Sequence, residues 1–133
     1  MMQLDTTAFE KAIASLERAV SRAQGSPDDE ELRDAVIQRF EYTMDLSWKL
    51  IQRALRNAGV QEGTIRTKRD LFREGAIMGW IVDPTTWFEY YDARNKTSYT
   101  YNAKVAQEVF QRAIAFFPES KDLCEKLQKV KND

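Results

Sequence analysis

Apolar side chains recur every three or four residues along most of this chain, which is the period of an amphipathic α-helix. The clearest example lies in the segment from Ser26 to about Asn57, where one unbroken apolar stripe is present. A stripe this regular predicts a long helix that packs against other helices. Its members are Ile37, Phe40, Met44, Trp48, Ile51 and Leu55.

The ends of this helix and of the helix before it are marked by residues with capping preferences. Ser26, Pro27 and Asp29 predict an N-cap, a first-turn proline and an acidic capping partner, and Gly59 predicts the end of the long helix. The preceding helix is expected to start at a cap formed by Thr6 or Thr7 and to end near Gly25. Its apolar positions are Phe9, Ile13, Leu16 and Val20.

Two shorter helices are predicted in the middle of the chain. Thr67 with Asp70 opens the first of them, and Asp83 before Pro84 opens the second. The first carries Leu71, Phe72, Ile77 and Met78, and the second carries Trp87, Tyr90 and Tyr91.

The helical period resumes after residue 101 and continues almost to the end of the chain. Pro118 is expected to kink this helix or to restart the chain there, because proline lacks the N–H that a helix interior needs. The apolar positions before it are Val105, Val109, Ala113 and Phe116, and those after it are Leu123, Leu127 and Val130.

No stretch alternates apolar and polar residues in the manner of a strand, so the predicted fold is all-α. We expect an up-and-down four-helix-type bundle with additional short helices, forming a single domain over residues 1–133. Trp48, Trp87 and the phenylalanines could form a base-stacking surface, but their helical spacing favours core packing.

Composition narrows the functional classes. The 20 basic and 21 acidic residues nearly cancel, which disfavours avid nonspecific binding of nucleic acids. No apolar run approaches the roughly 20 residues that span a bilayer, and the first residues do not resemble an export signal. We therefore expect a cytoplasmic protein without membrane association. Cys124 is the one cysteine and the chain contains no histidine, so we expect no metal site, no cofactor and no cysteine nucleophile.

Candidate chemistry concentrates in the segment Arg94–Tyr101, which holds a cation, an amide and two phenols within eight residues. The Arg94 guanidinium can offer two parallel donors to a phosphate, and Asn95 can add an amide donor. Tyr99 and Tyr101 can stack on a nucleobase. In the alternative interpretation, Arg94 ends a helix and pairs with a carboxylate while both tyrosines merely pack.

Two further groups of charges have alternative interpretations. Glu41 and Asp45 lie one helical turn apart and could sit beside Arg94 or hold a magnesium ion, although an ordinary ion pair between Asp45 and Lys49 on a solvated face is favoured. A basic cluster could receive phosphates or an acidic partner, but a solubilising charge run is the simpler interpretation. That cluster contains Arg66, Lys68, Arg69 and Arg73.

Several segments together resemble the nucleotidyltransferase substrate-binding proteins, which are small helical bundles of the HEPN superfamily. The resemblance covers about Phe9 to Leu127, and its most specific part is Arg94–Asn95 through Tyr101. The segments that carry it are Phe40-Glu41-Tyr42 with Asp45, Trp48 and Lys49, then Thr67 to Leu71, then Trp87 leading into Ala93 to Ser98.

The resemblance implies a small nucleotidyltransferase as partner, commonly bound as two copies flanking a homodimer of the helical protein. Some relatives form toxin–antitoxin pairs in which the helical protein is a metal-independent ribonuclease. Their motif has arginine, four variable residues, histidine, one residue and a tyrosine that the transferase modifies with nucleotide. In this chain the arginine is Arg94, the histidine position is Tyr99 and the modified tyrosine is Tyr101.

The tyrosine at the histidine position decides which function the sequence favours. Imidazole exchanges protons near neutral pH, whereas an ordinary phenol with a pKa near 10 is ionised in about one molecule in a thousand at pH 7. We therefore predict a non-catalytic substrate-binding, nucleotide-binding or regulatory subunit of a two-component nucleotidyltransferase, with catalysis in the partner. The predicted binding residues are Arg94, Asn95, Tyr99, Tyr101, Glu41 and Asp45.

The alternative is a HEPN-type ribonuclease toxin in which Tyr99 replaces histidine and nucleotide attachment at Tyr101 regulates activity. Under either hypothesis, nucleotide or RNA is a possible ligand of this chain.

Overall fold

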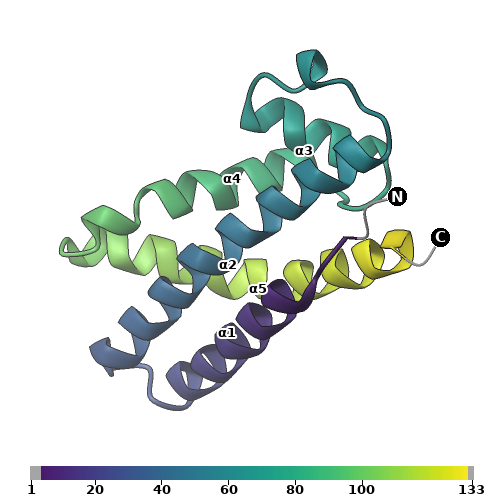
Figure 1. The fold of residues 1–133 in the computed structure, drawn as a ribbon. Helices are drawn as coiled ribbons and strands as arrows, with labels where there is room; N and C mark the ends of the chain where they lie inside the picture. Colours follow the sequence, from purple (N-terminus) through teal and green to yellow (C-terminus); the bar gives the residue numbers. More distant parts are fainter. Residues whose placement is uncertain (1–3, 132–133) are drawn as a thin grey trace.

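The computed structural model describes residues 4–131, and within this range the secondary structure is entirely helical (Figure 1). The prediction of an all-α fold is therefore confirmed. The helices are α1 (Thr7–Gly25), α2 (Glu30–Asn57), α3 (Lys68–Ile77), α4 (Pro84–Asn95) and α5 (Ala103–Lys131), with two short 3₁₀ helices, η1 (Glu62–Thr64) and η2 (Thr97–Tyr99).

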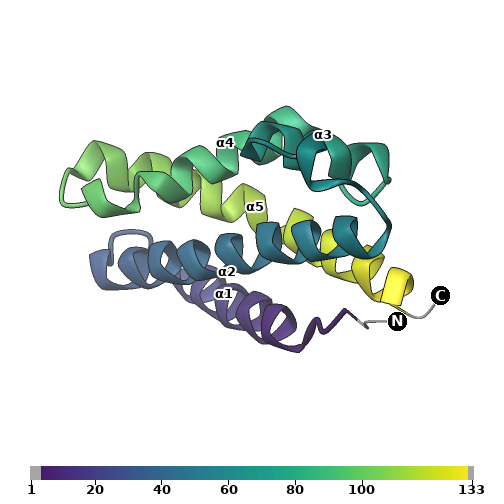
Figure 2. The same ribbon diagram turned by 45° about the horizontal axis from the view of Figure 1, so that its top comes forward.

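Two antiparallel helix pairs make up the bundle. Helices α1 and α2 form one hairpin, α4 and α5 form the other, and α3 with η1 connects the two hairpins at one end of the molecule (Figures 1 and 2). Helix α5 packs against α1, α2 and α4. None of the helices in residues 4–131 has the length and apolar character needed to cross a bilayer.

The helix starts agree with the sequence in two cases and differ in two. Thr67 and Asp70 form a complete capping box at α3, and Asp83 caps α4 before a proline. Helix α2 begins later than predicted: Asp29 is its N-cap and accepts hydrogen bonds from the amides of Glu31 and Leu32, while Ser26 caps the end of α1. The aspartate carboxylate can accept two amide hydrogen bonds, which makes Asp29 a better N-cap than Ser26. Pro27 therefore lies in the turn before α2 and not in its first helical turn.

Thr6 occupies the N-cap position of α1, but its side chain makes no capping hydrogen bond. Instead, Oδ1 of Asp5 accepts a hydrogen bond from the Thr7 amide at 2.9 Å. The prediction of a threonine cap was therefore correct in position and wrong in the group that supplies the bond.

Glycines end both helices that flank the η1 connection. Gly59 has φ of 88°, and its amide bonds to Arg56 O while the Val60 amide bonds to Leu55 O. Gly79 has φ of 81° and closes α3 in the same way. This pair of hydrogen bonds is a Schellman motif, whose left-handed residue strongly favours glycine.

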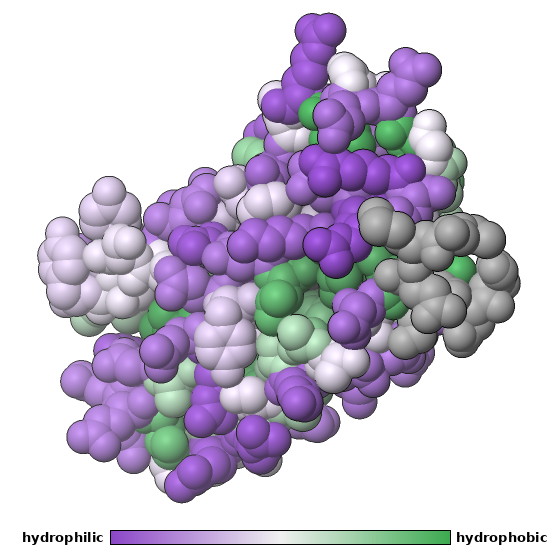
Figure 3. All heavy atoms as spheres, in the orientation of Figure 1, coloured by the Kyte–Doolittle hydropathy of each residue, from purple (hydrophilic) through white to green (hydrophobic). Residues whose placement is uncertain are grey.

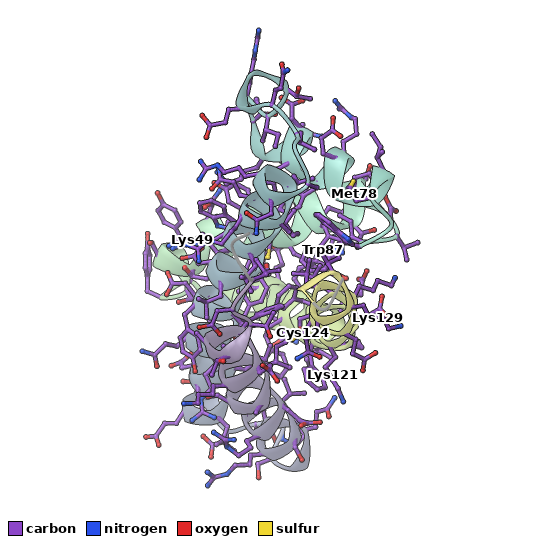
Figure 4. The ribbon with its side chains drawn as sticks, turned by 45° about the vertical axis from the view of Figure 1, so that its right-hand side comes forward. Lys49, Met78, Trp87, Lys121, Cys124 and Lys129 are labelled. Carbon is purple, nitrogen blue, oxygen red and sulfur yellow. The ribbon has the colours of Figure 1, made fainter. Side chains whose placement is uncertain are left out.

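The centre of the core is an aromatic cluster contributed by three helices. Phe116 of α5 makes edge-to-face contacts with Phe40 of α2, Trp87 of α4 and Tyr90 of α4, at centroid distances of 5.3, 5.5 and 5.4 Å. All four side chains are buried. Figure 4 shows Trp87 inside the bundle, whereas Lys121 and Lys129 point outward from α5.

Three sequence predictions about apolar or helix-breaking residues require correction. Ile77 and Met78 are not core residues, because they lie in the last turn of α3 and are 70% and 40% exposed. Of the two alternatives for Pro118, a restart of the chain is wrong, since α5 continues through it. A proline removes one main-chain hydrogen bond, and buried Phe116 and Leu123 anchor the helix on both sides of it.

A polar contact also accompanies this proline. The hydroxyl of Tyr90 donates to the Glu119 carboxylate and lies 3.4 Å from the Ala115 carbonyl. Burial, and then the contact with Glu119, raise the pKa of Tyr90 well above its ordinary value, so the phenol stays protonated and remains a donor. This contact ties α4 to α5 beside Pro118.

We expect Phe116→Ala to lower the free energy of unfolding by about 3 to 5 kcal/mol, because it leaves a cavity among three aromatic rings. Urea or thermal denaturation followed by circular dichroism measures this loss. Ile77→Ala removes an exposed apolar side chain from α3 and should change stability by no more than about 0.5 kcal/mol. Equal effects of the two substitutions would contradict this description of the core.

Candidate functional site

The segment Arg94–Tyr101 forms the turn between α4 and α5. Arg94 and Asn95 are in the last turn of α4, and η2 follows directly. Figures 1 and 2 place this connection at the end of the α4–α5 hairpin, and Figure 3 shows it projecting from the left of the molecule. The candidate residues are therefore presented at one tip of the bundle.

Arg94 is bound to helix α2 by a bidentate ion pair. Its Nε lies 2.7 Å from Oδ1 of Asp45, and its Nη2 lies 2.8 Å from Oδ2. Its Nη1 is 3.3 Å from Oε2 of Glu41, one helical turn away. Planar guanidinium and carboxylate groups match in this geometry, which makes the pair strong and directional. The sequence interpretation that places two carboxylates beside Arg94 is thus the one that the structure supports.

A threonine extends this network into the connection itself. The Thr97 hydroxyl lies 2.9 Å from Oε2 of Glu41 and 2.9 Å from the Arg94 carbonyl oxygen. On the other side, Nε1 of Trp48 donates to Oδ1 of Asp45 at 3.4 Å. These contacts tie both α4 and η2 to the same face of α2.

Two opposing effects act on the Asp45 carboxyl. Burial raises its pKa, but the hydrogen bonds and positive charge of Arg94, the Trp48 contact and the charge of Lys49 together hold the pKa below its ordinary value near 3.8. The hydrogen bonds to Asp45 in turn raise the pKa of Arg94. Both groups are therefore ionised at neutral pH.

The Asp45 pair leaves part of the Arg94 guanidinium available. A guanidinium carries five N–H donors, and Asp45 takes two of them along the Nε–Nη2 edge. A third donor, on Nη1, faces Oε2 of Glu41 at 3.3 Å, so two of the five donors have no carboxylate partner in this pair of contacts, on a side chain that is 27% exposed. Asp45 also removes conformational freedom from the arginine, which lowers the entropic cost of a second contact.

The other candidate residues are exposed and separate from this pair. Tyr99 and Tyr101 are 56% and 87% exposed, and Asn95 is also exposed. Within residues 4–131, the polar contacts of the Arg94 side chain go to Asp45 and Glu41 and do not include these three. The alternative interpretation is therefore right for Arg94, which lies in the last turn of α4 and pairs with Asp45, and wrong for the two tyrosines, which do not pack.

Sequence reasoning missed two residues of the network. Thr97 lies inside the candidate segment, but no role was assigned to it, although a hydroxyl three residues after Arg94 can reach the Arg94 carbonyl within one helical turn. Trp48 was assigned to the core, yet it is half-buried and bonds Asp45. Its position three residues after Asp45 on α2 was the available signal.

Comparisons with known proteins identify relatives across nearly the whole chain. Residues 4–129 match the family described as "Nucleotidyltransferase substrate binding protein like". A protein of Haemophilus influenzae named "Probable ribonuclease HepT" is 31% identical over 136 residues, which cover 95% of this chain and 93% of that protein.

Two solved structures share the fold. HI0074 of Haemophilus influenzae, described as having the fold of a substrate-binding domain of a nucleotidyltransferase, superposes with a TM-score of 0.83 and 28% identity, covering 93% of this chain and 99% of that one. A protein of Thermus thermophilus superposes with a TM-score of 0.74 and 29% identity, covering 90% of this chain and 98% of that one.

We expect a double-mutant cycle between Asp45→Asn and Arg94→Gln to give a coupling energy of about 1 to 3 kcal/mol at pH 7. Denaturant unfolding of the wild type, both single variants and the double variant measures it. Asp70→Asn at the capping box of α3 is a control for removing a carboxylate without touching Arg94. Independent effects of the two substitutions would show that the pair does not stabilise the fold.

The pH dependence of this coupling has a defined sign. Because the folded-state pKa of Asp45 is depressed, its stabilising contribution is fully present above the ordinary pKa near 3.8 and is lost as the pH falls through the lower folded-state value. The coupling should therefore be constant above about pH 5 and shrink at pH 3 or below.

Proposed function

Because this chain belongs to the nucleotidyltransferase substrate-binding-like family of HEPN proteins, we propose that it is a ribonuclease controlled by a small nucleotidyltransferase partner. The observation that carries the proposal is the fixed guanidinium of Arg94, which keeps free donors at a tip of the bundle that also presents two exposed phenols. The similarity to a protein named probable ribonuclease HepT supports the same assignment.

The residues of the tip have complementary roles in the proposed reaction. The 2′-oxygen of RNA attacks the adjacent phosphorus, the bond from phosphorus to the 5′-oxygen breaks, and a cyclic phosphate forms. Arg94 stabilises the negative charge that develops on the phosphoryl oxygens. The Tyr99 hydroxyl donates its proton to the departing 5′-oxygen. The proton of the 2′-hydroxyl passes to water, which makes the reaction slow.

Tyr101 has a different role in this proposal. Its side chain is 87% exposed, so the active site of a second protein can reach its hydroxyl. Attachment of a nucleotide there would add a phosphate and a base beside Tyr99 and block RNA at the tip. We expect the helical protein to act as a homodimer flanked by the transferase.

A non-catalytic role is the second candidate function. It is favoured by the lack of histidine in the sequence and by the two carboxylates around Arg94, which oppose the approach of a polyanion. In this case the protein binds nucleotide or substrate for the transferase and regulates it. RNA cleavage by the purified protein separates the two candidates.

We expect purified protein in EDTA to cleave a labelled single-stranded RNA slowly and to leave cyclic phosphate ends. Arg94→Ala should reduce the rate by about 100-fold or more, because it removes a charge-stabilising donor, and Tyr99→Phe should reduce it by a similar factor. Gel electrophoresis of the products measures both rates.

The matched control for this assay is Tyr42→Phe, which removes a partly exposed phenol that bonds Ser15 of α1 and takes no part in the Arg94 network. Its cleavage rate should equal that of the wild type. If the wild type cleaves no faster than a buffer blank but binds nucleotide in calorimetry, the ribonuclease assignment is wrong and the non-catalytic one stands.

We expect the partner transferase, supplied with ATP and magnesium, to attach a nucleotidyl group to Tyr101. Mass spectrometry of the intact protein and of its peptides locates the modification, and Tyr101→Phe should abolish it. Tyr99→Phe is the neighbouring control and should still be modified. Modification that persists in Tyr101→Phe would refute this assignment.

A further inference from the structure

Helices α2, α3 and α4 together form a face on which cations lie over aromatic rings. Four of the five cation–π contacts of residues 4–131 occur there. Nζ of Lys68 is 3.9 Å from the Trp48 ring centroid, and Cζ of Arg69 is 3.8 Å from that of Phe88. Nζ of Lys49 approaches the Trp48 ring at 5.7 Å. We refer to Lys49, Lys68 and Arg69, with Trp48, Phe88 and Tyr91, as the basic–aromatic strip.

Aromatic rings hold the three cations of the strip, and of the three only Lys49 also acts through its charge on Asp45. Within residues 4–131, no carboxylate lies within ion-pair distance of Lys49, Lys68 or Arg69. An aromatic ring orients a cation and leaves its full charge available to an anion. Some other cations of the bundle are paired with acids, among them Arg56 with Glu62, Arg73 with Asp70, Lys96 with Asp92, Arg112 with Glu89, and Lys126 with Asp122.

The strip is continuous with the Arg94 site. Trp48, which lies beneath Lys68, also donates to the Asp45 carboxylate that holds Arg94. On α4, Tyr91 lies three residues before Arg94 and therefore on the same face of the helix, and the Lys68 ammonium is 5.5 Å from its ring. A path of positive charge and aromatic edges thus runs from the start of α3 to the tip of the bundle.

We propose that the basic–aromatic strip binds the backbone of single-stranded RNA and leads it to Arg94. Ammonium and guanidinium groups suit phosphates, and the half-buried rings of Trp48, Phe88 and Tyr91 offer edges beside these cations for contacts with bases. An acidic protein surface would use the charges but has no need of the rings. The proposal rests on the proposed ribonuclease function, because it assigns the path of that substrate.

The test measures binding of a probe that cannot be cleaved. A fluorescein-labelled 2′-O-methyl oligouridylate of about 12 nucleotides lacks the free 2′-hydroxyl that cleavage needs, so binding is independent of catalysis. Fluorescence anisotropy over a series of salt concentrations gives the affinity and its salt dependence. The variant is Lys68→Gln with Arg69→Gln, and both side chains are outside the Arg94 network.

The matched control is Lys121→Gln with Lys129→Gln, which removes the same charge from α5. Figure 4 shows these two lysines on the side of the molecule opposite Lys49. A second variant, Lys68→Arg with Arg69→Lys, keeps both charges over the rings. Thermal melting of all variants reports whether each one folds.

We expect the Lys68→Gln, Arg69→Gln variant to bind at least about 10-fold more weakly at low salt and to reduce the slope of log affinity against log salt by about 1.4, since each phosphate contact with a single strand contributes about 0.7. The control and the charge-keeping variant should keep the wild-type slope. An unchanged slope in a variant that melts at a lower temperature would show that the contacts only pack α3, and the proposal would be wrong.

Three other outcomes are equally decisive. If the substitutions leave RNA binding intact but abolish capture of the transferase, the strip binds an acidic protein and the RNA proposal fails. If the wild type binds the probe through the strip but never cleaves unmodified RNA, the ribonuclease function fails while the strip stands. If the wild type cleaves RNA and the strip variant binds and cleaves equally well, the strip alone is refuted.

Discussion

The ion pair between Arg94 and Asp45 determines how the functional tip of this bundle is organised. The aromatic core around Phe116 holds the long helices together, but the turn between α4 and α5 lies beyond that core and carries exposed side chains. Two short hydrogen bonds from Arg94 to Asp45, together with the Thr97 contact to Glu41, fix this turn against α2. The candidate residues therefore stand on a fixed base although they are in solvent.

The same pair explains how one arginine can have both a structural and a functional role. The bidentate pair with Asp45 uses two of the five N–H donors of Arg94 and fixes its direction, Glu41 faces a third, and two donors remain without these carboxylate partners. Such an arginine resembles a catalytic group with its own positioning residue. Asp45 and Glu41 also place negative charge beside Arg94, which opposes the approach of an anion. The cations of the basic–aromatic strip supply positive charge along the neighbouring face.

The sequence predicted the helices well because helix periodicity and capping act over a few residues. The stripe on α2, the capping box at Thr67 and the proline after Asp83 depend on local geometry that the structure reproduces. Failures arose where distant contacts decide. Pro118 stays inside α5 because packing on both sides outweighs one missing hydrogen bond, and Ile77 is exposed because α3 turns a different side to the core.

In the candidate site, too, local patterns were predictable and contacts between distant segments were not. The segment Arg94–Tyr101 was identified from its residue types, and the pairing of Arg94 with carboxylates of α2 was one of the alternatives that the spacing of Glu41 and Asp45 allowed. The contact between Trp48 and Lys68 could not be predicted, since it joins α2 to α3 across a connection whose path no local pattern specifies.

The path of the connection between α2 and α4 includes two residues with positive φ. Gly59 ends α2 and Gly79 ends α3, both with positive φ, so the direction in which α3 leaves and rejoins the bundle is set at positions where a side chain is strongly disfavoured. In evolutionary terms, a substitution at either glycine would strain the turn that positions the helix carrying Lys68 and Arg69, without touching a charge. Loss of function in this fold can therefore originate in residues that contact no ligand and contribute nothing to the hydrophobic core.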